Sequence, residues 1–124
     1  MTHQLTDALT LALNADYGDE RLLSGLVTWK GVALYGRYAI GEQSAVALRA
    51  EILDDPAGYA TGLGLSRLDV KEATGTFEHT FADALILRCE ARYDFSNDRV
   101  FDKKTDINHQ QGQSTLLIGL VALF

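Results

Sequence analysis

The chain has 124 residues, enough for one domain with a single core, and its 17 acidic and 11 basic residues give a net charge of -6. This balance excludes a nucleic-acid-binding surface, because phosphate recognition needs a basic patch. The single cysteine, Cys89, excludes an internal disulfide. We find neither a signal peptide nor an apolar run of the ~20 residues that a spanning helix needs. The chain is therefore expected to be one domain over residues 1–124, either cytosolic or exported by a signal that this sequence does not include.

Apolar and polar residues alternate with a period of two along most of the chain, which indicates half-buried β-strands. In the clearest run, Leu85, Leu87, Cys89, Ala91, Tyr93 and Phe95 alternate with Arg88, Glu90, Arg92 and Asp94. Strands are expected over about 5–17, 27–40, 45–53, 68–81, 85–95 and 114–124, with polar loops at 18–21, 54–64 and 96–113 and short turns at 41–44 and 82–83.

These expected strands are long, and the turns between them are unequal. Strands of about ten residues exceed the five or six that are usual in soluble sheets, and they match the ~9–11 residues of a tilted membrane strand. Short turns at one end and longer loops at the other are typical of transmembrane barrels. We therefore predict an all-β antiparallel meander of about six long strands that forms a β-barrel or part of one.

Several stretches resemble a known family. They are residues 12–18 (ALNADYG), residues 47–51 (ALRAE) with 54–62 (DDPAGYATG), residues 88–97 with Val100, Phe101 and Asp102, and the apolar last strand that ends at Phe124. In this order and spacing they resemble the C-terminal part of the small OmpL-like β-barrel porins of Gram-negative outer membranes. The resemblance implies a non-enzymatic pore in contact with outer-membrane lipid, and it makes Phe124 the aromatic residue that the insertion machinery recognises.

The chain departs from this family in length. Members are longer, so the resemblance implies that upstream strands are absent from this sequence. Six strands cannot enclose a lumen, because bacterial single-chain barrels begin at eight. We therefore expect closure by self-association, for example two chains in a twelve-stranded barrel, or by upstream strands. The apolar face is also rich in small residues, namely Gly36, Ala50, Ala73, Gly75, Cys89 and Ala91.

The charged positions of the alternating strands are the candidate functional residues. If the apolar faces meet lipid, the other face lines a lumen and its charges set the preference for small solutes or ions. These residues are Arg37, Arg49, Glu51, Glu72, Glu78, Arg88, Glu90, Arg92 and Asp94. The alternative is a soluble small β-barrel for ligand binding or self-assembly, with the apolar faces inside and these charges on its solvated surface. Alternation is the same in both arrangements.

The remaining candidates are weaker. Tyr38, Phe81 and Phe124 at the turn end, and Tyr17, Trp29, Tyr93 and Phe95 at the loop end, would form two aromatic girdles in a membrane. Asp54 and Asp55 before Pro56 could hold a hard cation, but an Asx turn is the commoner role. The histidines His3, His79 and His109 have no ligand-spaced partner, so we expect no metal. Cys89 has no neighbouring base, and no cofactor or catalytic pair is indicated.

Overall fold

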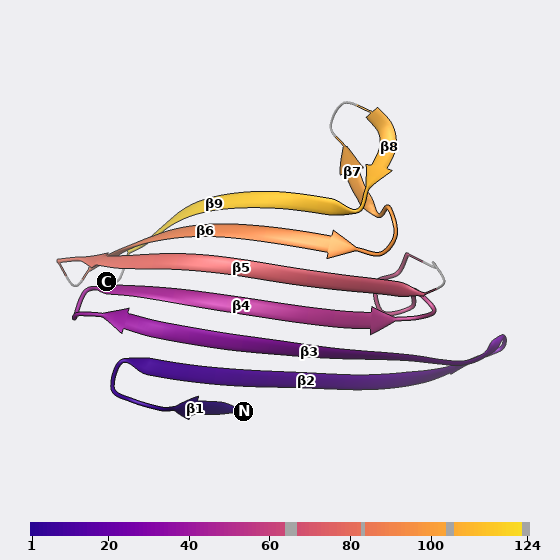
Figure 1. The fold of residues 1–124 in the computed structure, drawn as a ribbon, viewed down its shortest axis with the longest axis horizontal. Coiled ribbons are helices and arrows are strands. Elements are labelled where there is room, and N and C mark those ends of the chain that lie inside the picture. Colours follow the sequence, from indigo (N-terminus) through magenta and orange to yellow (C-terminus); the bar gives the residue numbers. More distant parts are fainter. Residues whose placement is uncertain (64–66, 83, 104–105, 123–124) are drawn as a thin grey trace.

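The computed structural model describes residues 1–63, 67–82, 84–103 and 106–122. These residues form nine β-strands, shown in Figure 1. The strands are β1 (Thr2–Gln4), β2 (Leu9–Leu22), β3 (Gly25–Ile40), β4 (Ser44–Asp55), β5 (Leu68–Phe81), β6 (Leu85–Ser96), β7 (Phe101–Lys103), β8 (Asp106–Gln110) and β9 (Gly112–Ala122). No helix that could cross a membrane occurs in these ranges.

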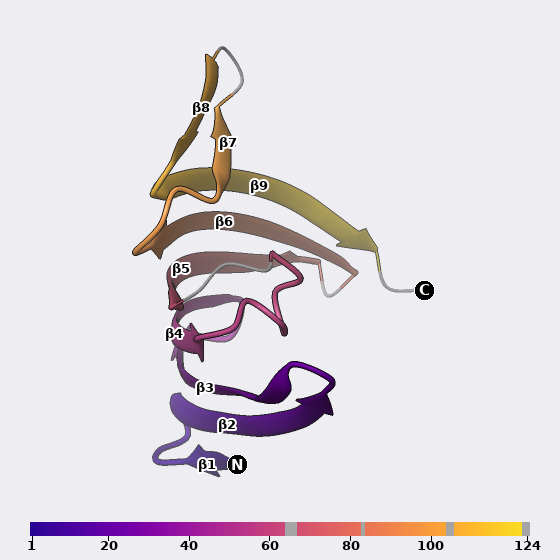
Figure 2. The ribbon, with the colours of Figure 1, turned by 90° about the vertical axis from the view of Figure 1, so that its right-hand side faces the viewer.

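Seven of the strands form one sheet in the order β1-β2-β3-β4-β5-β6-β9, and each pairs antiparallel with its neighbours. The predicted all-β antiparallel meander is therefore confirmed, with β1 as a short additional strand. The sheet is open in this structure, so β9 and the β1/β2 side are its two edges. Strands β7 and β8 form a separate hairpin that stands away from the sheet (Figures 1 and 2).

The strands differ from the expected ones mainly at the β2–β3 hairpin. Residues 18–21, expected to form a loop, are part of β2, which pairs with β3 as far as Leu22 opposite Gly25. A tight turn at Leu23 and Ser24 replaces the expected long loop. Polar residues are compatible with a strand here, because the hairpin extends beyond the rest of the sheet: β3 pairs with β4 only as far as Lys30 opposite Asp54. The polar connection 96–113 likewise contains β7 and β8.

The two ends of the sheet differ as predicted for the other connections. The turn 41–43 and the adjoining ends of β5 and β6 lie at one end, the left of Figure 1. The described part of the β4–β5 connection, residues 56–63 and 67, and the strands β7 and β8 lie at the other end, together with the β2–β3 turn. We call these the turn end and the loop end.

Burial distinguishes the two faces of the sheet. Nine buried residues are found among those described: Gly58 in the β4–β5 connection and eight on the strands or their ends, which all occupy the alternating positions shared with the charged residues. The eight strand residues are Ala33, Ala45, Asp55, Leu68, Glu72, Thr74, Asp94 and Ser96. Large apolar side chains on the opposite face are exposed, with Leu48 at 71% and Leu116 at 82%. Seen from the loop end, the sheet is curved and the β4–β5 connection lies inside the curve (Figure 2). The charged face is therefore the inner face, and the apolar face is the outer one.

Candidate functional site

The strand register arranges the nine predicted charged residues in rows on the inner face. Glu51 on β4 lies opposite Glu72 on β5, which lies opposite Asp94 on β6. One step closer to the turn end, Arg49 and Arg92 flank Thr74. The first of these rows is therefore acidic, and the next one, in which two arginines flank a threonine, is basic.

The two rows are joined by ion pairs. The guanidinium of Arg49 donates to the carboxylates of both Glu51 and Glu72, and the hydroxyl of Thr74 also donates to Glu72. The guanidinium of Arg92 donates to Asp94, with nitrogen–oxygen distances of 2.6 to 3.0 Å. The arginines therefore compensate carboxylates that are nearly buried, since Glu72 is 7% and Asp94 5% exposed.

A second charged cluster lies closer to the turn end. Glu78 accepts two hydrogen bonds from Arg88, at 2.9 and 2.5 Å, and lies 3.5 Å from a guanidinium nitrogen of Arg37. One carboxylate thus serves two guanidinium groups. The three residues of this cluster come from β3, β5 and β6, and β4 lies between the first two of these strands in the sheet.

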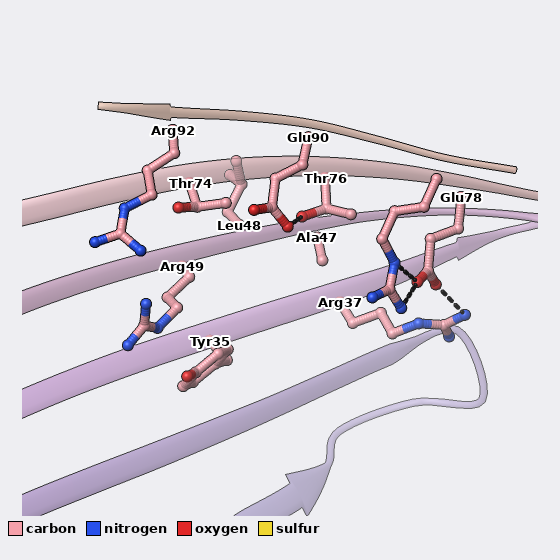
Figure 3. A pocket seen from close by; sticks show the side chains of 11 residues that line it. Tyr35, Arg37, Ala47, Leu48, Arg49, Thr74, Thr76, Glu78, Glu90 and Arg92 are labelled. Carbon is pink, nitrogen blue, oxygen red and sulfur yellow. Dashed lines mark hydrogen bonds and ion pairs between the residues drawn. The ribbon is translucent and has the colours of Figure 1, made fainter. Parts of the chain in front are cut away.

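A hollow of about 430 Å³ lies between these clusters on the inner face (Figure 3). The small side chains of Ala47, Thr74 and Thr76 leave this space open. Glu90 points into it, and its carboxylate accepts a hydrogen bond of 3.3 Å from the hydroxyl of Thr76. Six of the predicted charged residues line the hollow: Arg37, Arg49, Glu78, Arg88, Glu90 and Arg92.

Tyr35, Thr74 and Thr76 also line this hollow and were not among the predicted site residues. The ring of Tyr35 lies 5.3 Å from the guanidinium carbon of Arg49, which is a cation–π distance. All three residues have the parity of the charged positions along their strands. That parity is the signal that could have identified them.

The outer face carries an apolar belt that ends before the loops. The belt extends on β3 and β4 from Tyr38 and Val46 to Val32 and Ile52. The next position on this face is the ion pair of Lys30 with Asp54, at 3.1 Å. Charged side chains on the outer face therefore mark the limit of the belt at the loop end.

Aromatic side chains lie on the outer face at both limits of this belt. Tyr38 and Phe81 are exposed at the turn end, and Tyr17, Tyr93 and Phe95 are exposed toward the loop end. The prediction for Trp29 is wrong. Trp29 has the parity of the inner face, where it covers Gly18 and packs against Tyr59 with ring centroids 5.5 Å apart.

Asp55 anchors the β4–β5 connection over the inner face. It is fully buried and accepts hydrogen bonds from the backbone N–H of Tyr59 (3.0 Å) and from the N–H and hydroxyl of Thr61 (both 2.9 Å). These bonds reach four and six residues along the chain, further than the two of an Asx turn, so Asp55 orders the whole connection. Asp55 lies beyond the apolar belt. Burial alone would raise its pKa, but hydrogen bonds from Thr61 and Tyr59 outweigh burial and lower the pKa below its ordinary value.

The other weak candidates have structural surroundings. His79 Nδ1 lies 2.8 Å from the hydroxyl oxygen of Ser44, and the imidazole packs edge-on against Phe81. Cys89 is partly exposed on the outer face. Among the residues whose side chains the structure describes, no group of His, Cys, Asp and Glu could hold a metal ion. Phe124, the predicted insertion signal, lies outside the described residues.

Comparison with known proteins gives one family. The family model described as putative beta-barrel porin-2, OmpL-like, matches residues 1–124, the whole chain. No curated protein and no solved structure matches.

Proposed function

Because the chain belongs to the OmpL-like β-barrel porin family, we propose that it forms the wall of an outer-membrane pore through which small solutes or ions diffuse passively. In this proposal the apolar belt meets lipid and the nine charged residues line the water-filled lumen. The chain performs no catalysis. The observation that carries the proposal is the inverted burial: the carboxylates of Glu72 and Asp94 are buried on the inner face while leucine and isoleucine side chains are exposed on the outer one.

The inverted burial favours this function over a soluble barrel. Water-exposed leucines such as Leu48, Leu116 and Leu120 would forgo the transfer free energy of roughly 25 cal/mol per Å² that burial provides. A soluble barrel would have to curve the other way, with the apolar face inside. The same exposed side chains are stabilising when hydrocarbon covers them, as on the outside of a membrane barrel.

We further propose that the sheet closes by pairing its two edges through a second copy of the chain. An open edge in lipid leaves backbone N–H and C=O groups unpaired, at a cost of several kcal/mol for each group. The order of the sheet makes β9 parallel to β1 and antiparallel to β2. Antiparallel closure by identical copies around a pore axis therefore needs β1, which is paired with β2 over only three residues, to leave the sheet. Residues upstream of β1 are the alternative source of strands.

Solute flux through labelled variants tests the pore. Ala47 lies on the inner face and Leu48, its neighbour in the chain, on the outer face. In a Cys89→Ala background, Ala47→Cys and Leu48→Cys proteins are reconstituted in vesicles and treated with a bulky thiol reagent. We expect the reagent to reduce flux in the Ala47→Cys protein and to leave the Leu48→Cys protein unchanged. Absence of flux in the untreated protein would contradict the pore.

Mass measurement tests the closure. Light scattering on the protein in detergent should give a defined oligomer, and removing residues 1–4 should preserve it, because β1 leaves the sheet in this arrangement. A folded monomer in detergent would contradict self-association. A dimer that requires residues 1–4 would contradict the displacement of β1.

A further inference from the structure

Glu90 differs in its contacts from every other charged residue that lines the hollow. Each of the four arginines there has an ion-pair partner: Arg37 and Arg88 with Glu78, Arg49 with Glu51 and Glu72, and Arg92 with Asp94. Within the described part of the chain, the carboxylate of Glu90 has no ion pair and only the hydrogen bond from Thr76. Its charge is therefore available to a solute.

The balance of charge around the hollow depends on this residue. The lining residues and their ion-pair partners comprise four guanidinium groups and five carboxylates, which leaves a net charge of -1 when Glu90 is ionised. Without the charge of Glu90 the cluster is neutral. The residues that line the hollow, together with their ion-pair partners, thus carry a net charge equal to that of one carboxylate.

We propose that Glu90 is the residue that makes the hollow selective for small cations, with a primary ammonium group as the best fit. Glu90 and Thr76 supply oxygen acceptors, and the hollow of about 430 Å³ has room for such a group beside them. An anion would gain less here, because the charge of each guanidinium is already compensated by a carboxylate. This inference rests on the proposed pore, which brings solutes past the inner face.

The local potential can be measured without solute flux. Ala47 lies in the same row as Thr76 and Glu90, so the thiol of the Cys89→Ala, Ala47→Cys protein reports the potential beside Glu90. We would compare the reaction rates of a cationic and an anionic methanethiosulfonate reagent in lipid vesicles. Adding Glu90→Gln should lower the cation-to-anion rate ratio by roughly twofold to fourfold, the effect in water of one unit charge about 10 Å away, the spacing of residues two strands apart.

Two further variants isolate the position of the charge. Glu42→Gln removes the same charge from the turn after β3 and should leave the ratio unchanged. Glu90→Asp retains the charge and should preserve most of the cation preference. A ratio that does not respond to Glu90→Gln, or responds equally to Glu42→Gln, would overturn the proposal. If the ratio responds as expected but the vesicles show no flux, the cation site stands and the pore function fails.

Discussion

Trp29 lies directly over Gly18 on the inner face of the β2–β3 hairpin. A Cβ atom added at Gly18 would lie 2.2 Å from Cζ2 and 2.3 Å from Cε2 of the indole, distances at which one of the two groups must move. The indole also packs against the ring of Tyr59 in the β4–β5 connection. Gly18 is therefore needed for a close approach that ties the hairpin to this connection.

Gly18→Ala should displace the indole and destabilise the protein by about 1–3 kcal/mol, the usual cost of overpacking. Trp29 is the only tryptophan, so intrinsic fluorescence reports its surroundings directly. We expect the emission maximum to shift to the red as the ring loses its contacts. Gly119→Ala is the matched control, because a Cβ there meets no atom within 4 Å. An unchanged spectrum in Gly18→Ala would contradict this packing.

Asp55→Asn should loosen the β4–β5 connection. The substitution removes the charge that receives three hydrogen bonds and turns an amide NH₂ toward some of the same donors. Hydrogen bonds to a charged group contribute about 1.5–3 kcal/mol each, so hydrogen exchange at the Thr61 amide should accelerate at least about tenfold. Asp54→Asn, which alters only the exposed ion pair with Lys30, should leave this exchange rate unchanged.

The same carboxylate predicts an effect of pH. The pKa of Asp55 is lower in the folded protein than its ordinary value of 3.8, so ionised Asp55 stabilises the connection. That contribution is complete above the ordinary value and is lost as the pH falls through the lower folded pKa. Exchange at Thr61, corrected for its intrinsic pH dependence, should therefore accelerate below about pH 4. The Asp55→Asn protein should lack this acceleration, and its persistence there would assign it to another group.

The Arg49–Glu72 pair should contribute more than the exposed pair of Lys30 with Asp54. Glu72 is nearly buried, whereas 69% of the Lys30 side chain and 33% of the Asp54 side chain are exposed. A double-mutant cycle with Arg49→Gln and Glu72→Gln should give a coupling of about 1–3 kcal/mol in the free energy of unfolding from lipid. The cycle for Lys30 and Asp54 should give about 0.2–1 kcal/mol. Equal couplings would contradict the role assigned to burial.

Leu48→Arg tests whether lipid covers the outer face. Leu48 lies in the middle of the apolar belt, and Leu26 lies on the same face beyond Lys30. An arginine near the bilayer midplane costs about 2–4 kcal/mol, but near the interface only about 0–1 kcal/mol. Unfolding from lipid should therefore show a much larger loss for Leu48→Arg than for Leu26→Arg. Similar losses for the two variants would mean that water covers both positions.

Period-two alternation predicted most of this fold, because one residue in two faces inward and the pattern fixes the faces of β3 to β6. It placed Arg49, Glu72 and Asp94 on one face without further information. It failed at residues 18–21, where β-pairing with β3 continues through polar residues, and at Trp29, where an aromatic type suggested an interface although the parity indicated the inner face. The ion-pair choices that leave Glu90 available depend on side-chain geometry, which no sequence pattern contains.

The inverted burial has a consequence for how this chain acquires its structure. A protein in water gains most of its folding free energy by collapsing its apolar side chains onto one another. Here the buried residues are mostly polar or small, so collapse in water has little reason to select this sheet. The outer leucines release their transfer free energy only on meeting another apolar phase. Folding and insertion are therefore expected to be a single thermodynamic step, in which the lipid takes the place of a hydrophobic core.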